Sequence, residues 1–323
     1  MRTHPPDHDA RLARAHLALH GLSVGDAFGE TYFVKPDVVE DLLDQRALRA
    51  RRPWRWTDDT AMAISIVRIL AEHGTVDRDA LATAFARSYR AEPHRGYGHA
   101  AHEILSAIGD GVPWRVASIA AFGGEGSMGN GGAMRAAPVG AYFAGDLEQV
   151  VDEARRSAEP THAHPDGQAG AIAVAVAAAI ATDIVSGRRP RSPGMLFEEV
   201  IAHTPDGPTR KRLEVAAGID LGTDVRAVAK QIGCGWQVVS FDTVPFAVWC
   251  AARHLDSYEE ALWTTVRALG DRDTTCAIVG GIVVMALGAD SVPAEWQAAR
   301  EPLPEELISP PARRAPPGGA RRE

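Results

Sequence analysis

Two short acidic segments, far apart in the chain, carry the side chains best suited to chemistry. The first is 57–60, Thr-Asp-Asp-Thr, and the second holds Asp271, Asp273 and Thr274. Each precedes an apolar stretch with helical spacing, so each is expected at the start of a helix. Carboxylate and hydroxyl oxygens suit Mg²⁺, and four neighbouring carboxylates would repel one another without a cation. The pattern predicts a divalent-cation site if the two turns meet; the alternative is ordinary capping of two separate helices.

A glycine-dense loop is the second candidate. The segment SMGNGGAMRAAPVG covers 127–140, and its glycines around Asn130 leave backbone N–H groups bare. Such a loop can cradle a phosphate, although it lacks the Gly-Lys-Ser/Thr of a nucleotide-binding P-loop. A plain flexible turn is the alternative. Arg135 is expected to pair with a phosphate or with an acidic side chain.

Two further segments are less specific. In 160–173, His162 and His164 precede an alanine-rich stretch, and His-x-His spacing can hold a transition metal. No third soft ligand is evident nearby, so hydrogen bonding to a ligand or capping of the following helix is favoured over metal binding. The segment 233–249, GCGWQVVSFDTVPFAVW, fits the wall of a pocket for an aromatic ring and fits a plain core turn equally well.

The elements that must position these residues are predicted to be helices. Strand patterns are scarce, whereas apolar residues recur at helical spacing through most of the chain. The stretch 168–186 is apolar on all sides, which is typical of a central buried helix. We predict an all-α fold of roughly a dozen helices, at 10–22, 58–73, 78–90, 98–109, 146–158, 168–186, 193–203, 208–218, 224–231, 241–254, 257–269 and 274–287. Gly280 and Gly281 in the last of these would permit close helix packing.

No linker or repeat divides the chain, so a single domain over 10–300 is expected. The segment 1–9 is expected to be a flexible N-terminus. The segment 309–323 is rich in Pro, Gly and Arg and is expected to be a flexible tail.

The composition excludes several classes of protein. The 323 residues are 46% hydrophobic and 24% charged, the mix of a folded globular protein. The formal charge of −8 argues against a broad basic surface for duplex nucleic acid, but leaves room for a small basic patch. Three cysteines without Cys-x-x-Cys spacing favour a cytoplasmic protein over a disulfide framework. The N-terminus lacks a signal-peptide pattern, and the longest apolar stretch, 169–181, is too short to span a bilayer, so no membrane partner is expected.

Taken together and in order, the segments resemble the ADP-ribosylglycohydrolase family, of the dinitrogenase-reductase-activating glycohydrolase type. The ordered pair TDDT and DxDT is the most specific part of this resemblance. The matching pieces are GLSVGDAFGE (21–30), WTDDTAMAI (56–64), RGYG (95–98), GNGGAMRAAPVG (129–140), THAHPDGQAGA (161–171), GCGWQVVSFDTVPFAVW (233–249), DRDTTCAIVGGIVVMALGA (271–289) and VPAEW (292–296).

The resemblance implies a compact orthogonal helical bundle with two Mg²⁺ ions, or Mn²⁺ in some members, and ADP-ribose as the recognised group. Water would attack C1″ of the distal ribose and release ADP-ribose from an acceptor. The implied metal ligands are Thr57, Asp58, Asp59, Asp271, Asp273 and Thr274, of which Asp58 and Asp273 are also assigned to catalysis. The implied substrate-binding residues are Gly98, Gly129, Asn130, Gly131, Gly132, Met134, Arg135, His162, Gly235 and Trp236.

Two departures from the family pattern concern the catalytic acid and the acceptor. Many relatives carry a Glu where this chain has Phe33, and Glu30 is the only acid nearby, so Glu30 is the hypothetical catalytic acid. Some arginine-directed relatives carry an Asp in the segment that aligns with RGYG, and its absence here favours an O-linked acceptor. Expected partners are ADP-ribosylated protein or nucleic acid, and a monomer is expected.

Two other functions remain open from the residues. One is a non-catalytic ADP-ribose-binding regulatory module, in which the Glu at position 33 would be lost. Such relatives usually lose the metal ligands too, and here all six positions are filled. The other is an unrelated Mg²⁺-dependent phosphohydrolase, which would release AMP or phosphate instead of intact ADP-ribose.

Overall fold

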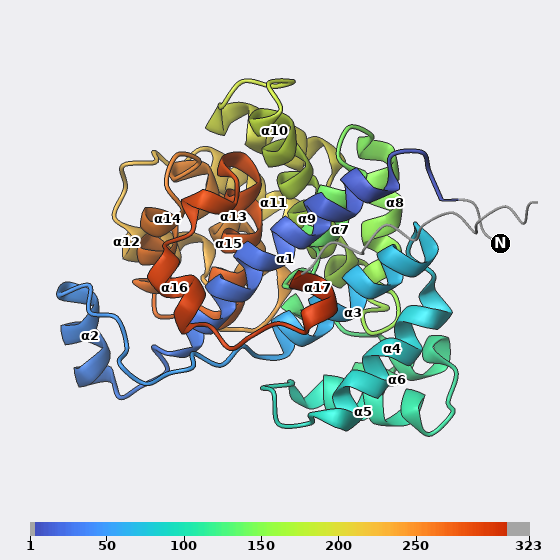
Figure 1. Cartoon of the computed structure of the whole chain (residues 1–323). Coiled ribbons are helices and arrows are strands. Elements are labelled where there is room, and N and C mark those ends of the chain that lie inside the picture. The colour runs from blue at the N-terminus through green and yellow to red at the C-terminus, as the bar shows by residue number, and fades with distance from the viewer. Residues whose placement is uncertain (1–3, 309–323) are drawn as a thin grey trace, which may run out of the picture.

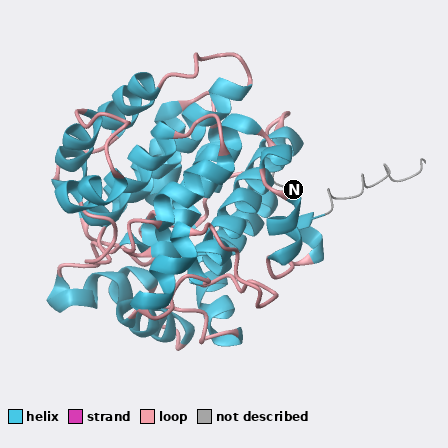
Figure 2. Cartoon of the chain, turned by 90° about the vertical axis from the view of Figure 1, so that its left-hand side faces the viewer, coloured by secondary structure: helices cyan, strands magenta, loops and turns pink. Residues whose placement is uncertain are grey.

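The chain folds almost entirely into helices. The computed structural model describes residues 4–308, and within this range seventeen α-helices and two 3₁₀ helices are joined by loops, with no strand (Figure 2). The all-α prediction is therefore confirmed. The helices outnumber the predicted dozen because several short ones lack a clear apolar period in the sequence.

In chain order, the helices are α1 (His8–Glu30), α2 (Pro36–Asp44), α3 (Asp58–His73), α4 (Arg78–Ala91), α5 (His99–Gly109), α6 (Trp114–Gly124), η1 (Asn130–Gly132), α7 (Ala137–Phe143), α8 (Leu147–Ala158), α9 (Pro165–Val185), α10 (Pro193–His203), α11 (Pro208–Ala217), α12 (Val225–Ile232), α13 (Ser240–Arg253), α14 (Tyr258–Val266), α15 (Arg272–Leu287), η2 (Ala289–Ser291), α16 (Ala294–Ala299) and α17 (Glu305–Ile308) (Figure 1).

Helix α9 forms the centre of the bundle. It packs against α7, α8, α10, α13 and α15, and every residue from Ala169 to Ile184 is buried. By length and composition alone this helix could cross a membrane, but 89% of its most apolar window is buried inside the protein. It therefore has the environment of a core helix, as the sequence predicted.

The contact between α1 and α15 is unusually close because glycines line it. A Cβ added at Gly21 would lie 2.5 Å from the carbonyl oxygen of Gly280, and one at Gly25 would lie 2.1 Å from that of Cys276. Gly29 continues the row one turn further, where an added Cβ would lie 2.2 Å from the carbonyl oxygen of Arg272. Only glycine allows backbones to approach this closely. The close packing expected at Gly280 is thus confirmed, and its partner is α1.

Flexible segments were predicted at both ends of the chain. Helix α1 begins inside the segment 1–9 that was expected to be flexible, and His8 Nδ1 lies 2.6 Å from the hydroxyl of Tyr142. Because His8 belongs to α1 and contacts Tyr142, the folded part of the chain begins before residue 10. The predicted tail, 309–323, lies outside the described residues.

Candidate active site

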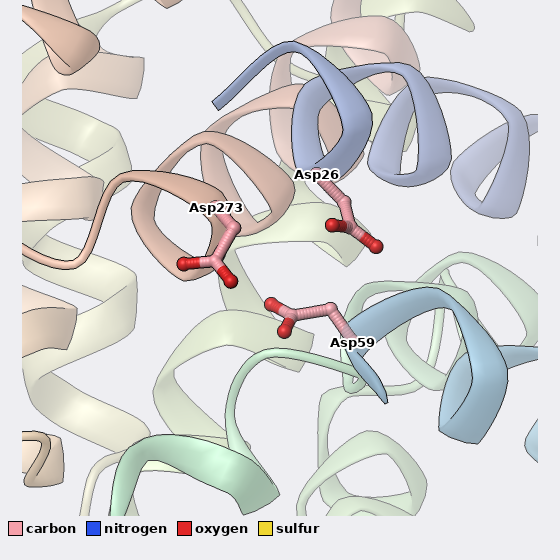
Figure 3. A group of neighbouring side chains, drawn as sticks. All are labelled: Asp26, Asp59 and Asp273. Atoms are coloured by element: carbon pink, nitrogen blue, oxygen red, sulfur yellow. The ribbon is translucent and has the colours of Figure 1, made fainter. Parts of the chain in front are cut away.

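The two acidic turns meet, as the cation-site interpretation requires. Asp26, Asp59 and Asp273 project toward one another from α1, α3 and α15 (Figure 3). One carboxylate oxygen from each lies within 4.8 Å of the others. Three separate helices thus deliver hard oxygen ligands to one point, which is a donor set suited to Mg²⁺ or Mn²⁺.

Asp26 holds the start of α3 in place. Its carboxylate accepts hydrogen bonds from the backbone N–H of Thr57 at 2.9 Å and of Thr60 at 3.1 Å. It also accepts from the two threonine hydroxyls, at 2.9 Å from Thr57 and 2.5 Å from Thr60. Both backbone donors belong to the first turn of a helix, where they lack partners within the helix. A carboxylate on α1 therefore caps α3, and Thr57 makes no capping hydrogen bond to its own helix.

The carboxylate of Asp59 has far fewer hydrogen-bond partners than that of Asp26. The Thr57 hydroxyl lies 3.1 Å from Asp59 Oδ2 and can donate either to it or to Asp26. Asp59 Oδ1 is buried and has no hydrogen-bond partner. A buried carboxylate oxygen without a partner is costly unless a cation meets it. A buried oxygen without a partner, on a residue of the carboxylate cluster, fits a metal site.

The electrostatics of the cluster support the same interpretation. Desolvation, then the nearby charge of Asp26, raises the pKa of Asp58 to about 7. Desolvation is also the main cause that raises the pKa of Asp273 to about 7, and the pKa of Asp59 and of Asp271 lies well above the usual range. Without a counter-ion these groups resist ionisation at neutral pH. The pKa of each of the four predicted metal-binding carboxylates is therefore raised by burial and by the charge of other carboxylates nearby.

The predicted threonine ligands lie at the same two helix starts. Thr57 and Thr274 are buried, and the Thr274 backbone N–H donates to Asp273 Oδ1 at 2.9 Å. The six predicted ligands thus lie at two helix starts that meet, and two of them, Asp59 and Asp273, belong to the group within 4.8 Å.

The glycine-dense loop is tethered to the acidic cluster. Asn130 is buried, and its side-chain amide donates to Asp271 Oδ2 at 2.7 Å and to the Thr243 hydroxyl at 3.0 Å. Gly129 pairs with Val239 in an isolated antiparallel bridge, so the loop also lies beside the segment before α13. Asn130, predicted to bind substrate, commits its amide to orienting Asp271.

His162 lies directly under this loop. A Cβ at Gly131 would come within 3.1 Å of the His162 ring, and one at Gly129 within 3.5 Å. The ring is buried, its Nδ1 lies 2.8 Å from the Thr161 hydroxyl, and desolvation lowers its pKa to about 3. His162 is therefore a neutral support beneath the glycines.

His164 instead caps α9, since its Nδ1 accepts from the Asp166 N–H at 3.0 Å. Capping of the following helix, one of the two roles favoured from the sequence, is thus observed at this position.

Arg135 differs most from its predicted role. It is 1% exposed, and its guanidinium donates to the Gly131 carbonyl at 2.7 Å and to the Thr161 hydroxyl at 2.7 Å. These contacts are made behind the loop, on the side of Ser157, and not on an open surface. In this structure Arg135 fixes the loop from the inside, and its contact with a phosphate stays a prediction. Met134 is likewise buried.

The remaining predicted substrate residues border the cluster. The RGYG segment lies against the first acidic turn, where the Asp58 N–H donates to the Arg95 carbonyl at 2.7 Å. Gly98 is exposed at the start of α5, with open space where a Cβ would stand. Gly235 touches the second turn, since an added Cβ would lie 2.4 Å from Asp271 Cβ, and the neighbouring Trp236 is 68% exposed.

Glu30, the hypothetical catalytic acid, ends α1 beside the second acidic turn. Its carboxyl is half-buried, and desolvation raises its pKa against the opposing charges of Arg55 and Arg272. Glu30 and Asp273 influence each other electrostatically. Phe33 is 46% exposed, and the Arg272 guanidinium lies 4.3 Å from its ring centre. Glu30 therefore lies nearer to the acidic cluster than its place in the sequence, three residues before Phe33, suggested.

The sequence analysis missed Asp26. A signal was present, because Asp26 is the one charged residue in the otherwise small and apolar run LSVGDAFG. A carboxylate in such a run is expected to be buried, and a buried carboxylate needs donors or a cation.

Comparison with known proteins places the chain among enzymes of one type. The family model described as ADP-ribosylglycohydrolase matches residues 7–315, so the chain belongs to this family, whose members are hydrolases of ADP-ribosyl bonds. It is 28% identical to human ADP-ribosylhydrolase ARH3, over 92% of each chain. It is 25% identical to the ADP-ribosyl-[dinitrogen reductase] glycohydrolase of Rhodospirillum rubrum, over 91% of each. A solved structure, titled an ADP-ribosylglycohydrolase-related protein complex, shares the fold with a TM-score of 0.64 at 24% identity, over 90% of this chain and 93% of that one.

Proposed function

We propose that this protein is a metal-dependent hydrolase that releases ADP-ribose from an O-linked acceptor. One observation carries the proposal: carboxylates from α1, α3 and α15 converge within 4.8 Å, and one of their oxygens is buried without a partner. Family membership supplies ADP-ribose as the group that the site recognises. The cluster supplies the reason for a requirement for divalent cations.

The donor set fits two Mg²⁺ ions, with Mn²⁺ as an alternative. The residues that would hold them are Thr57, Asp58, Asp59, Asp271, Asp273 and Thr274, with Asp26 at the same point. When bound, such ions polarise oxygen atoms and acidify water. Each neighbouring cation also favours the ionised form of these carboxylates.

Side chains and loops of the protein would transfer the protons and hold the substrate. Water would give one proton to a carboxylate of the cluster as it attacks C1″, the bond from C1″ to the acceptor oxygen would break, and that oxygen would take up one proton as it leaves. We assign the supply of that proton to Glu30, because its raised pKa favours the acid form that a poor leaving group needs. The glycine loop over His162 would receive the diphosphate, and the segment at Gly235 and Trp236 would lie on the adenine side.

The preferred acceptor rests on the RGYG segment. It holds no Asp at the position where some arginine-directed relatives carry one, which favours an O-linked bond. The test is a panel of ADP-ribosylated Arg, Ser, poly-ADP-ribose, O-acetyl and nucleic-acid substrates, with ADP-ribose release measured by chromatography in Mg²⁺ and in EDTA. Release of intact ADP-ribose only in Mg²⁺ supports the proposal, whereas AMP or phosphate as the product contradicts it.

One observation favours a second function, a regulatory module that binds ADP-ribose with little turnover. Phe33 replaces the Glu that many relatives carry, so the site has one acid fewer. Tight binding of ADP-ribose without turnover of any acceptor, in both Mg²⁺ and Mn²⁺, would establish this function. Loss of turnover in Glu30→Gln with metal binding intact would instead support Glu30 as the acid.

A further inference from the structure

A second feature lies beside the acidic cluster: a cleft walled by arginines. The segment 49–55 joins α2 to α3 and contains four arginines among its seven residues. Together with Glu30 and Phe33 at the end of α1, it lines a cavity of about 490 Å³. The arginines that contribute to this wall are Arg49, Arg51, Arg52 and Arg55.

The backbone of this segment is fixed by Trp54. The Trp54 N–H donates to the Ala299 carbonyl at 2.7 Å, and the Trp54 carbonyl accepts from the Glu301 N–H at 2.8 Å. The indole N–H donates to the Arg49 carbonyl at 3.0 Å, and the buried indole lies among the rings of α1 and α16. The segment therefore runs beside the end of the chain's described part on an anchored path (Figure 1). This anchoring holds the backbone that carries the arginines at the cleft.

The positive charge of the cleft is mostly uncompensated. Arg52 pairs with Glu295 at 2.8 Å, whereas no ion pair within the described residues engages the guanidinium groups of Arg49, Arg51 or Arg55. Two acids line the cleft. Glu301 is already neutralised by a two-point contact with Arg95, at 2.7 and 2.8 Å, and Glu30 faces the charge of Arg55 without forming an ion pair with it. Arginines without ion pairs beside one cavity, in a chain of net charge −8, are suited to bind an anion.

The cleft borders the candidate active site at Glu30. This residue lines the cleft, the charge of Asp271 raises its pKa, and its own charge raises the pKa of Asp273. A molecule in the cleft would therefore lie next to the residue that is proposed to protonate the leaving acceptor oxygen.

We infer that the arginine cleft binds the phosphate backbone of a single-stranded nucleic acid that carries the ADP-ribosyl group. This inference rests on the proposed function and narrows its acceptor. Guanidinium forks match phosphate oxygens, and the ring of Phe33, which packs against Arg272 but is still 46% exposed, offers an aromatic contact for a base beside them. An acidic peptide would use the arginines but would gain nothing from the exposed part of that ring.

The test is the binding of an unmodified, fluorescently labelled single-stranded DNA oligonucleotide to the full chain, measured by anisotropy over a range of salt concentrations. The triple variant Arg49→Gln/Arg51→Gln/Arg55→Gln should bind on the order of tenfold more weakly. Its slope of log affinity against log salt should be shallower by about 2, since three phosphate contacts are removed.

The matched control removes three exposed cations from α4, α8 and α12, which contribute no residue to the cleft. It is Arg87→Gln/Arg156→Gln/Lys230→Gln, and it should bind the oligonucleotide like the wild-type protein. Equal loss in both triple variants, unchanged binding in the cleft variant, or equally tight binding of a poly-glutamate peptide at the same salt would each overturn the inference.

A second measurement separates this inference from the proposed function. For an ADP-ribosylated oligonucleotide, the KM of the cleft variant should rise on the order of tenfold relative to the control variant. Salt-dependent oligonucleotide binding without hydrolysis would support the cleft and contradict the proposed function. Hydrolysis with equal KM in the two variants would support the function and overturn the cleft.

Discussion

Asp26 and Asp59 point into the same carboxylate cluster, but the protein satisfies them differently. Asp26 accepts from two backbone N–H groups and two hydroxyls, whereas one oxygen of Asp59 has no partner. Asp26 therefore caps helix α3, whereas Asp59 has an oxygen that can bind a ligand. Substitution should separate the two roles.

Replacement of Asp26 should destabilise the protein even with metal present. Asp26→Ala leaves the buried donors of Thr57 and Thr60 without an acceptor, so the free energy of unfolding in saturating Mg²⁺ should fall by about 3 kcal/mol. Urea unfolding followed by circular dichroism measures this difference. A stability equal to that of the wild-type protein would contradict the capping role.

Replacement of Asp59 should have the opposite effect on stability. Asp59→Asn removes a buried carboxyl group whose pKa is raised well above its ordinary value by desolvation, so at neutral pH the metal-free protein should gain about 1 kcal/mol or more. ADP-ribose release should fall more than about 100-fold, because a metal ligand is lost. Asp58→Ala and Asp273→Ala should likewise abolish turnover without lowering metal-free stability. Retained activity in both alanine variants would defeat the metal assignment.

For single residues, the sequence predicted which types of side chain form the site better than it predicted what each side chain does. The two acidic turns could be identified because each combines carboxylates and hydroxyls with a helix start. Asp26 lies inside a helix far away in the chain, and only its position in the fold reveals its four donors. Arg135 illustrates the same limit, since its charge suggested a phosphate while its burial assigns it to the support of the loop.

At the scale of elements, the crossing of α1 on α15 builds the cluster. Glycines at positions 21, 25 and 29 of α1 face carbonyl oxygens of α15, and this contact brings Asp26 beside Asp273. The site therefore depends on helix packing as much as on its ligands.

A side chain in this contact should damage both fold and site. In Gly25→Ala the new Cβ would start 2.1 Å from the Cys276 carbonyl oxygen, so the helices must separate, at a cost of about 3 kcal/mol or more. The thermal midpoint and the affinity for Mn²⁺ should both fall. Gly194→Ala, at the start of α10, meets no heavy atom closer than 3.9 Å and serves as the control. Equal midpoints for the two variants would show that the contact is not tight.

The sequence also predicted most of these elements well. Helices with strong end signals match closely: α3 was expected at 58–73 and spans Asp58–His73, and α10 was expected at 193–203 and spans Pro193–His203. Helix α1 was expected to end at 22 but runs to Glu30, because glycines that lower helix propensity serve packing here. Short helices such as α2 and α16 offered too few turns for a period to be seen.

At the scale of the whole molecule, metal-free stability should depend on pH. In the unfolded chain, Asp58 and Asp273 ionise near their ordinary pKa of 3.8, whereas in the folded protein they keep their protons until about 7. Folding is therefore disfavoured progressively as the pH rises through that range. His162 acts in the opposite direction only below its ordinary pKa of 6.5, because its pKa is lowered in the folded state.

In EDTA, the free energy of unfolding should accordingly be lower at about pH 8 than at about pH 6.5, by about 1–3 kcal/mol. Saturating Mg²⁺ should abolish most of this difference, because the ionised carboxylates then have a counter-ion. Denaturant unfolding at the two pH values, with and without Mg²⁺, measures it. A metal-free stability that rises with pH would contradict the repulsion within the cluster.

The most direct measurement of the central claim is a Mn²⁺ titration of the metal-stripped protein, followed by electron paramagnetic resonance. Two ions per chain are expected, with occupancy lost in Asp59→Asn and Asp273→Ala and with ADP-ribose release rising in step with occupancy. Absence of specific Mn²⁺ binding in the wild-type protein, or full hydrolysis by the stripped protein in EDTA, would contradict a metal centre built from the two acidic turns.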